Sequence, residues 1–164
     1  MDIMKEVIFL LGGNLGDKAQ NFKQTTELIA ENIGEISGQS SIYATDAWGF
    51  ESEDIFWNQV LIIQTQLDPI DVLNAAQHVE QLLGRVRSGE GYSSRTMDVD
   101  ILFIDDMIIN HERLIVPHPL LQERRFALIP LVEVRRNMKH PVLNSSMQEL
   151  LDQCPDKLEV KKVK

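Results

Sequence analysis

The sequence predicts an α+β fold built on an antiparallel sheet. Runs of apolar and β-branched residues alternate with stretches of helical spacing, in the order strand, helix, strand, strand, helix, strand. Both helical stretches begin after an aspartate, Asp17 and Asp68, and Pro69 takes the first helical position of the second. This order is that of a ferredoxin-like βαββαβ sandwich, in which helices are expected to cover one face of the sheet. The remaining residues predict an extra hairpin and C-terminal helices.

The expected elements follow one another without a linker that would divide the chain. They are a strand at 6–11, a helix at 18–32, strands at 40–45 and 57–67, a helix at 69–83, a strand at 98–104, a small hairpin at 105–110 and a helix at 146–153. One domain over residues 1–164 is therefore expected.

Local signals justify the elements of the first half. The apolar run at 7–11 ends at a glycine pair, which is typical of a buried strand followed by a turn. Phe22 and Ile29 have helical spacing within 18–32. Gly34 and Gly38 are expected to break the chain before the strand at 40–45. β-branched residues mark the strand at 57–67, and Gly84 is expected to stop the second helix.

The second half begins with a polar loop rich in Gly and Ser, at 85–95. The apolar run at 101–104 marks the third long strand, and Asp105-Asp106 predicts the turn of the small hairpin. The stretch "PHPLLQERRFALIPLVEV" has a helical pattern in two short pieces that Pro130 is expected to separate. The charged tail "DKLEVKKVK" is expected to be partly ordered.

Composition narrows the class of protein. A chain of 164 residues that is 43% hydrophobic can bury an ordinary core. Its single cysteine, Cys154, cannot form an internal disulfide, which fits a reducing compartment. The apolar run at 7–11 is too short for a signal sequence or a membrane span. A soluble, cytoplasmic monomer is expected.

The charge pattern suggests an anion site. A formal net charge of −9 argues against general binding to nucleic acid or to an anionic membrane. All eight arginines lie between Arg85 and Arg136, and no lysine occurs between Lys23 and Lys139. Arginine offers planar, bidentate contacts to phosphate, so the cluster is consistent with a phosphate site. Chance clustering on a solvated surface explains it equally well.

Two acids carry the clearest chemistry. Asp98 and Asp100 are two residues apart, so a strand turns both side chains to the same face. Paired carboxylates suit Mg²⁺, which takes its other ligands from water and substrate phosphates. Arg85, Arg87 and Arg95 precede the pair, and acids with arginines are the groups that phosphoryl transfer uses. A surface turn in which Arg95 neutralises the acids is the alternative.

Aromatic residues suggest a second ligand. Phe56 and Asn58 share a strand face, and an aromatic ring beside an amide can hold a flat heterocycle by stacking and hydrogen bonding. Trp48 and Phe126 are candidates to complete that pocket. For Phe56 and Trp57, ordinary core packing is the alternative.

Other motifs are absent or weak. The chain has neither G-x-x-x-x-G-K-[ST] nor G-x-G-x-x-G, and "LGGNLG" is more typical of a tight turn between a strand and a helix than of a ligand site. The four histidines lack metal-ligand spacing, and only His118, in "VPHPLL", is expected to have a function. Cys154 has no neighbouring base, so no reactivity is assigned to it.

Six segments, taken in order from Leu10 to about Leu131, resemble the 6-hydroxymethyl-7,8-dihydropterin pyrophosphokinase family of folate biosynthesis. They are "LGGNLGD", "YATDAWG", "FWNQV", "QHVEQLLGRVR", "RTMDVDILF" and "RLIVPHPLLQERRFAL". The resemblance implies the ferredoxin-like fold and transfer of pyrophosphate from ATP to the hydroxymethyl group of the pterin, with release of AMP.

The resemblance also implies roles for individual residues. Asp98 and Asp100 are expected to hold two Mg²⁺ ions, and Arg85 and Arg95 to hold the triphosphate during transfer. The expected ATP-site residues are Gln77, Glu80, Arg87, Tyr92, Ile101, Arg113, His118 and Arg124. The expected pterin-site residues are Gly12, Asn14, Thr45, Asp46, Trp48, Phe56, Asn58 and Phe126, with Phe56 and Phe126 on either side of the ring. Loops 46–55 and 85–95 are expected to close over the substrates and exclude water.

Six positions depart from the pattern of the family. Asp46 stands where proline is common, Tyr92 where tryptophan is frequent, and Ser93-Ser94 where Gly-Pro is usual. Arg125 replaces a frequent glycine, and Ile115 replaces a hydroxyl residue. None of these departures removes an expected metal ligand or a principal arginine.

Two other functions are compatible with parts of the sequence. A D-x-D pair also occurs in nucleotide-sugar transferases, although this chain lacks their parallel α/β pattern. Ferredoxin-like sheets can bind RNA, although the charge of −9 argues against it. Formation of AMP from ATP in the presence of the pterin would distinguish the pyrophosphokinase from both.

Overall fold

The computed structural model describes residues 3–45, 55–84 and 96–163. Its main sheet has the strand order β5-β1-β4-β3-β8, and β2 also pairs with β4. These strands are β1 (Lys5–Gly13), β2 (Glu35–Gln39), β3 (Tyr43–Thr45), β4 (Phe56–Thr65), β5 (Asp98–Ile104) and β8 (Val160–Lys162). All of their pairings are antiparallel. A separate small sheet joins β6 (Ile109–Asn110) to β7 (Ile115–Val116).

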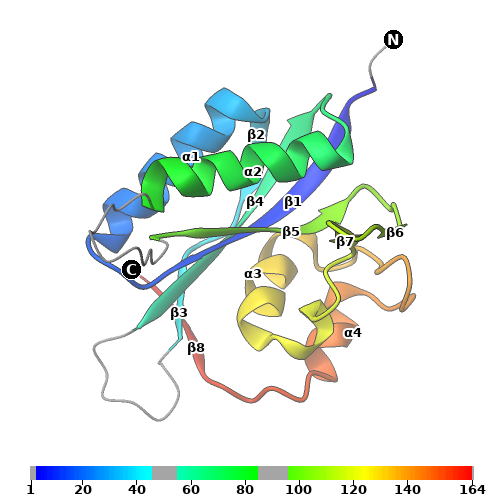
Figure 1. The fold of residues 1–164 in the computed structure, drawn as a ribbon. Helices are drawn as coiled ribbons and strands as arrows, with labels where there is room; N and C mark the ends of the chain where they lie inside the picture. The colour runs from blue at the N-terminus through cyan, green and yellow to red at the C-terminus, as the bar shows by residue number, and fades with distance from the viewer. Residues whose placement is uncertain (1–2, 46–54, 85–95, 164) are drawn as a thin grey trace.

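Helices cover both faces of the main sheet (Figure 1). One face carries α1 (Lys18–Asn32) and α2 (Pro69–Gly84); the other carries α3 (Arg125–Arg135) and the short α4 (Met147–Asp152), with the turn η1 (Leu121–Glu123) just before α3. The expectation that helices cover one face alone is therefore wrong. The reason lies in β1, where all five residues from Val7 to Leu11 are at most 3% exposed and need cover on both sides.

The two helical layers enclose two halves of the core. Val7, Phe9 and Leu11 pack beneath α1 and α2, whereas Ile8 and Leu10 pack beneath α3 and α4. Burying an aliphatic side chain contributes roughly 1.5–3 kcal/mol, so these alternating residues fix the central strand between the layers. Among the described residues, no helix is long and apolar enough to cross a membrane.

Side-chain caps explain where two of the helices begin. The Asp17 carboxylate accepts the backbone N–H of Gln20 at 3.1 Å, and α1 then spans the predicted residues. Ser146 and Glu149 form a reciprocal capping box at the start of α4. Such a cap typically contributes about 1 kcal/mol to helix stability.

Three local expectations are wrong. Residues near Gly34 and Gly38 form β2 instead of a break, because a Cβ at Gly34 would lie 2.0 Å from the Gln64 carbonyl oxygen and only glycine permits this approach to β4. Pro130 lies inside an unbroken α3, where it is buried with Leu128. The hairpin partner of β6 is β7, rather than the end of β5.

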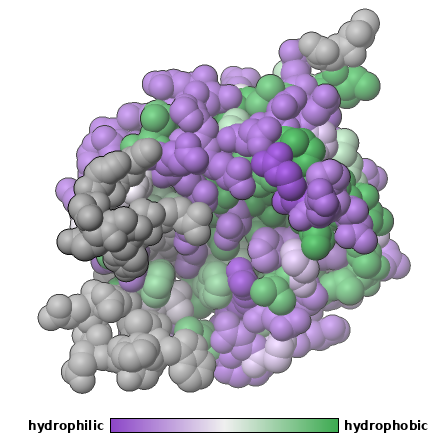
Figure 2. All heavy atoms as spheres, in the orientation of Figure 1, coloured by the Kyte–Doolittle hydropathy of each residue, from purple (hydrophilic) through white to green (hydrophobic). Residues whose placement is uncertain are grey.

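Hydrophilic side chains cover most of the described surface in the view of Figure 2. Apolar residues show between α2 and the β6–β7 hairpin (Figures 1 and 2). A patch of exposed apolar side chains often marks a ligand site.

Candidate active site

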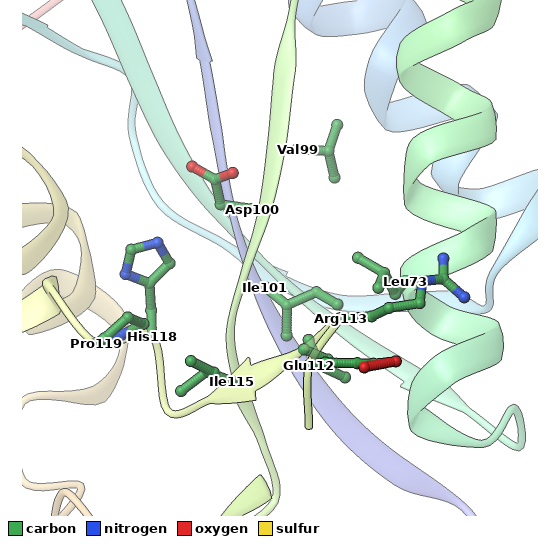
Figure 3. Close-up of a pocket in the computed structure, with 10 residues that line it drawn as sticks. Leu73, Val99, Asp100, Ile101, Glu112, Arg113, Ile115, His118 and Pro119 are labelled. Atoms are coloured by element: carbon green, nitrogen blue, oxygen red, sulfur yellow. The ribbon is translucent and has the colours of Figure 1, made fainter. Parts of the chain in front are cut away.

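Two aspartates open β5 at one end of the sheet. Val99 and Ile101 pack into the core half beneath α1 and α2, so alternation along the strand turns Asp98 and Asp100 toward the opposite face. In Figure 3 the Asp100 carboxylate points away from α2, toward the side on which His118 lies. Asp98 is exposed and Asp100 is half-buried. Both carboxylates are therefore within reach of a ligand at this end of the sheet.

A third carboxylate holds the backbone between these acids. Glu80 lies on α2, is 9% exposed, and its Oε2 accepts the backbone N–H of Val99 at 2.7 Å. Because β5 ends the order of the described strands, its outer N–H groups have no neighbouring strand within that part of the chain. Glu80 supplies an acceptor for one of these groups. It thereby fixes the backbone of β5 at Val99, between the two aspartates.

A cavity of about 270 Å³ opens beside Asp100. Its lining comes from α2, β5, the β6–β7 hairpin and the segment that follows: Leu73, Val99, Asp100, Ile101, Glu112, Arg113, Leu114, Ile115, His118 and Pro119. Leu73, Ile101 and Ile115 are among its apolar side chains, while Arg113 and His118 add hydrogen-bond donors (Figure 3). This combination suits a ligand that has a flat, apolar part and an anionic part.

Arg113 is held by a residue that no sequence pattern indicated. Its Nη2 donates to Oδ1 of Asn74, on α2, at 2.6 Å. Its backbone N–H donates to Nδ1 of His111 at 3.0 Å. These two bonds position the guanidinium at the cavity, and a sequence read without its tertiary contacts gives no sign of the pairing between Asn74 and Arg113.

His118 presents one defined nitrogen. Its Nδ1 accepts the backbone N–H of Leu120 at 3.2 Å, so the neutral ring carries its proton on Nε2. Burial and then the positive charge of Arg124 lower the pKa of His118, against a smaller opposing effect of Asp100. The neutral ring therefore offers an Nε2–H donor on the side of Asp100 and the cavity.

A cross-strand row joins Asp98 to a second set of residues. Asp98 pairs with Gly12, and Gly12 pairs with Asn58, across β5, β1 and β4. Directly paired residues point to the same face, and two strand spacings separate the outer members by roughly 10 Å. A Cβ on Gly12 would lie 2.8 Å from Nδ2 of Asn58. Glycine therefore lets the Asn58 amide lie close over the β1 backbone, and this row of a carboxylate, a glycine and an amide forms a floor.

The Asn58 side of this floor has the parts of a pocket for a flat ring. Asn58 is 7% exposed and its Nδ2 donates to the Leu11 carbonyl at 3.3 Å, which turns Oδ1 outward. Phe56, two residues away, is 42% exposed. Within the described part of the chain, the buried Oγ1 of Thr45 makes no hydrogen bond. An orphaned buried hydroxyl beside an exposed aromatic ring is compatible with a polar ligand at this place.

Phe126 and Arg124 approach this pocket from the start of α3. The guanidinium carbon of Arg124 lies 5.7 Å from the centroid of the Phe126 ring, within the range of a cation–π contact. The charge of Arg124 also lowers the pKa of His118 at the cavity, so Arg124 lies within reach of both Phe126 and His118.

A family model agrees with this geometry. The model described as 7,8-dihydro-6-hydroxymethylpterin-pyrophosphokinase (HPPK) matches residues 8–136, which is more than half of the chain. The chain belongs to this family. As a pyrophosphokinase it transfers pyrophosphate from ATP to the hydroxymethyl group of 6-hydroxymethyl-7,8-dihydropterin in folate biosynthesis, and the function expected from the sequence is confirmed.

Two bacterial relatives carry the name 2-amino-4-hydroxy-6-hydroxymethyldihydropteridine pyrophosphokinase. The protein from Aquifex aeolicus is 36% identical over 146 residues, covering 89% of this chain and 90% of its own. The protein from Bacillus subtilis is 39% identical over 125 residues, covering 76% of this chain and 74% of its own. Both relatives are therefore matched over most of their length.

Solved structures share the fold of this pyrophosphokinase. A crystal structure of HPPK-DHPS in complex with substrates has a TM-score of 0.73 at 14% identity, over 91% of this chain. Plasmodium falciparum HPPK-DHPS with pterin and p-hydroxybenzoate has a TM-score of 0.73 at 17% identity, over 93% of this chain. This chain spans 43% of each of those longer chains. The ferredoxin-like α+β class expected from the sequence is confirmed.

The structure brings only part of the expected pyrophosphokinase site into view. Asp100, Ile101, Arg113 and His118 line the cavity. Gln77 is exposed on α2, one turn after Leu73, and Asn14 is half-buried just after β1. The two expected closing loops lie outside the described residues, except for Ile55. Six expected site residues also lie outside them: Asp46, Trp48, Arg85, Arg87, Tyr92 and Arg95. Leu73, Asn74 and Glu112 were not expected from the sequence. They reach the cavity or Arg113 through tertiary contacts, which exist only in the folded chain.

Proposed function

We propose that this pyrophosphokinase binds ATP in the cavity beside Asp100 and the pterin on the floor at Gly12, with Mg²⁺ between them at Asp98 and Asp100. The observation that supports this arrangement is the cross-strand row, in which Asp98 faces Asn58 across a glycine that has no side chain. Asp98 and Asn58 are about two strand spacings apart in this row, a separation that supports adjacent sites. A phosphate chain from the cavity can therefore meet an alcohol at the floor.

The donor set fits Mg²⁺. Asp98 and Asp100 supply carboxylate oxygens from one strand face, and Mg²⁺ prefers oxygen ligands while keeping several waters. Among the described residues, no group of three or more His, Cys, Asp or Glu side chains could form an all-protein cluster. Because two carboxylates fill only part of the coordination shell of Mg²⁺, positions remain for phosphate oxygens. This donor set therefore fits two Mg²⁺ ions that bind together with ATP. When bound, Mg²⁺ would neutralise charge on the phosphates and orient them.

The chain's own residues then bind and orient ATP. Leu73, Ile101 and Ile115 form the apolar wall for the base, and Arg113, held by Asn74, binds an anionic or hydroxyl group beyond it. Neutral His118 donates its Nε2–H to a phosphate oxygen. Phosphoryl transfer has a loose transition state, so such positioning and charge neutralisation supply most of the rate enhancement. Arg85 and Arg95 are proposed to add positive charge at the transferred group.

The pterin ring is proposed to stack between Phe56 and Phe126. Asn58 and Thr45 then hydrogen-bond its polar edge, and the orphaned Thr45 hydroxyl is the observation that supports this contact. The ring orientation directs the hydroxymethyl group toward Asp98. Because the nucleophile is a neutral alcohol, orientation rather than a strong base is what the site provides.

We further propose that residues 1–164 act as one domain and as a cytoplasmic monomer that does not bind nucleic acid or membranes. The net charge of −9 and the core that runs from β1 to α4 support this proposal. Light scattering during size-exclusion chromatography would contradict it by giving twice the monomer mass.

A product assay with matched aspartate variants tests the site. Wild-type protein with ATP, Mg²⁺ and the pterin alcohol should form AMP and the pterin diphosphate, without ADP. Asp98→Asn and Asp100→Asn should each lower kcat by about 100-fold or more, while pterin binding measured by fluorescence changes little. Asp106→Asn, in the exposed turn at the other end of β5, is the control and should behave as wild type. Turnover within twofold of wild type in both site variants would overturn the metal role.

A further inference from the structure

The C-terminal tail touches both walls of the proposed pterin pocket. The family match ends at residue 136, and the chain continues through α4 into a segment that returns along the sheet edge as β8 (Figure 1). One end of this segment contacts the start of α3, where Phe126 lies. The other end contacts β3, where Thr45 lies.

The contact with α3 is made by Asp156. Its Oδ2 accepts the backbone N–H of Arg125, the first residue of α3, at 3.2 Å, and its Oδ1 accepts the N–H of Leu158 at 3.0 Å. The residue at the N-cap position, Arg124, makes no capping bond with its own side chain. Asp156 therefore supplies from the tail the acceptor and the negative charge that a helix start requires.

The contact with β3 is made by β8. Val160 pairs with Thr45 and Lys162 with Tyr43, and the Val163 N–H donates to the Ile42 carbonyl at 2.8 Å. β8 thus covers the outer edge of β3 along its whole length. The pair of Val160 with Thr45 fixes the backbone at Thr45, the residue whose buried hydroxyl makes no hydrogen bond within the described part of the chain.

The piece of chain between these contacts is short. Four residue steps separate Asp156 from Val160, and extended chain spans at most roughly 3.3–3.6 Å per residue. The tail is therefore a tether of about 14 Å at most between the start of α3 and the end of β3. A tether of limited length restricts how far the two pocket walls can separate.

We infer that Asp156 is a positioning residue for the pterin: it anchors the tail to the start of α3, and the tail sets the position of Phe126 relative to Thr45. This inference rests on the proposed pterin pocket. Asp156 touches neither substrate, and it acts through the helix start that carries Phe126.

Steady-state kinetics of Asp156→Ala test the inference. The KM for the pterin should rise about tenfold, because small displacements of a binding wall weaken binding strongly, while kcat and the KM for ATP stay within twofold. Asp156→Asn keeps one carbonyl acceptor for two N–H groups and should fall between wild type and Asp156→Ala. Asp152→Ala, an exposed acid at the end of α4, is the control and should leave both KM values unchanged.

Phe126→Ala separates failure of the inference from failure of the pocket proposal. If Phe126→Ala raises the pterin KM and Asp156→Ala leaves it within twofold, the tail has no positioning role. If Phe126→Ala leaves the pterin KM unchanged, the pocket itself is wrongly assigned. A loss shared equally between the two substrates in Asp156→Ala and Asp156→Asn indicates general destabilisation and would also overturn the inference.

Discussion

The Glu80 carboxylate on α2 accepts the backbone N–H of Val99 at 2.7 Å, between the two aspartates of the proposed active site. Glu80 comes from a different element than the acids it positions, and it is nearly buried. This short hydrogen bond ties the edge strand β5 to α2. The two aspartates therefore project from a backbone that α2 fixes.

Replacing Glu80 should weaken the use of Mg²⁺. Glu80→Ala leaves the Val99 N–H without this acceptor and lets the strand shift, so kcat at fixed Mg²⁺ should fall by about 10- to 100-fold, as for other residues that orient metal ligands. Glu80→Gln keeps an acceptor oxygen and should retain much more activity. The measurement is the initial rate against Mg²⁺ concentration, and identical curves for Glu80→Ala and wild type would refute the positioning role.

Gly12→Ala should impair pterin binding more than ATP binding. The new Cβ would lie 2.8 Å from Nδ2 of Asn58, so the amide must move from its bond to the Leu11 carbonyl. The methyl group also occupies the floor on which the ring is proposed to lie. The pterin KM should rise about tenfold or more, with the KM for ATP little changed.

Gly38→Ala is the control for Gly12→Ala, because it adds the same methyl group away from the proposed pterin site. Gly38→Ala places a Cβ 3.2 Å from Cδ1 of Ile62, the flexible end of a side chain far along the sheet from the floor. It should leave both KM values near those of wild type. Equal effects of Gly12→Ala and Gly38→Ala on the pterin KM would argue against a ligand at the floor.

The parts of the fold with strong local signals could be predicted from sequence. The helix α1 and the strand β5 occur at the expected residues, because Asp17 caps the helix and an apolar run marks the strand. β2 could not be predicted, since its alternate residues are exposed and it exists through pairing with β4. The course of α3 through Pro130 depends likewise on tertiary packing, which offsets the lost hydrogen bond.

The same distinction applies to the site. Asp98 and Asp100 stand out in sequence because both acids belong to one strand. Glu80 and Asn74 act through partners 19 and 39 residues away. Asp156 lies beyond the family match and reaches α3 only in the folded chain. The sequence named Glu80 only as an expected ATP-site residue, and the contacts through which Glu80, Asn74 and Asp156 position other residues appear only in the fold.

Protonation of His140 should destabilise the protein as the pH falls. His140 is 4% exposed, and its Nδ1 accepts the N–H groups of Val142 and Leu143, each at 3.1 Å. Burial lowers its pKa below the ordinary 6.5. As the pH falls through 6.5, His140 takes up a proton in the unfolded chain before it does so in the folded chain. The contribution of neutral His140 to stability is therefore complete above pH 6.5 and is lost as the pH falls toward the lower pKa of the folded protein.

Denaturant unfolding of His140→Asn isolates this effect. Asparagine keeps an acceptor for the two N–H groups but does not titrate, so the variant should lose less stability than wild type between about pH 7.5 and about pH 5.5. His118, whose pKa is also lowered, is present in both proteins and cancels in the comparison. Parallel losses in the two proteins would contradict the assignment to His140.

Tyr43 should titrate far later than an ordinary tyrosine. Its hydroxyl donates to Oε1 of Glu133 at 2.9 Å, and Glu133 also accepts two hydrogen bonds from Ser41. Burial, then the hydrogen bond and the negative charge of Glu133, raise the pKa of Tyr43 to about 12. In the unfolded chain a tyrosine has a pKa of about 10. The contribution of protonated Tyr43 to the stability of the fold is therefore complete below that pH and is lost as the pH rises toward 12.

The chain contains two tyrosines, Tyr43 and Tyr92, so tyrosinate absorbance can resolve them. One of the two should ionise near pH 12 in the folded protein, and Tyr43→Phe should remove that late phase. Glu133→Gln removes the negative charge and should shift the late phase to lower pH, because ionised Tyr43 would then face a neutral amide. A late phase that persists in Tyr43→Phe would assign the high pKa to the other tyrosine and contradict the contact as its cause.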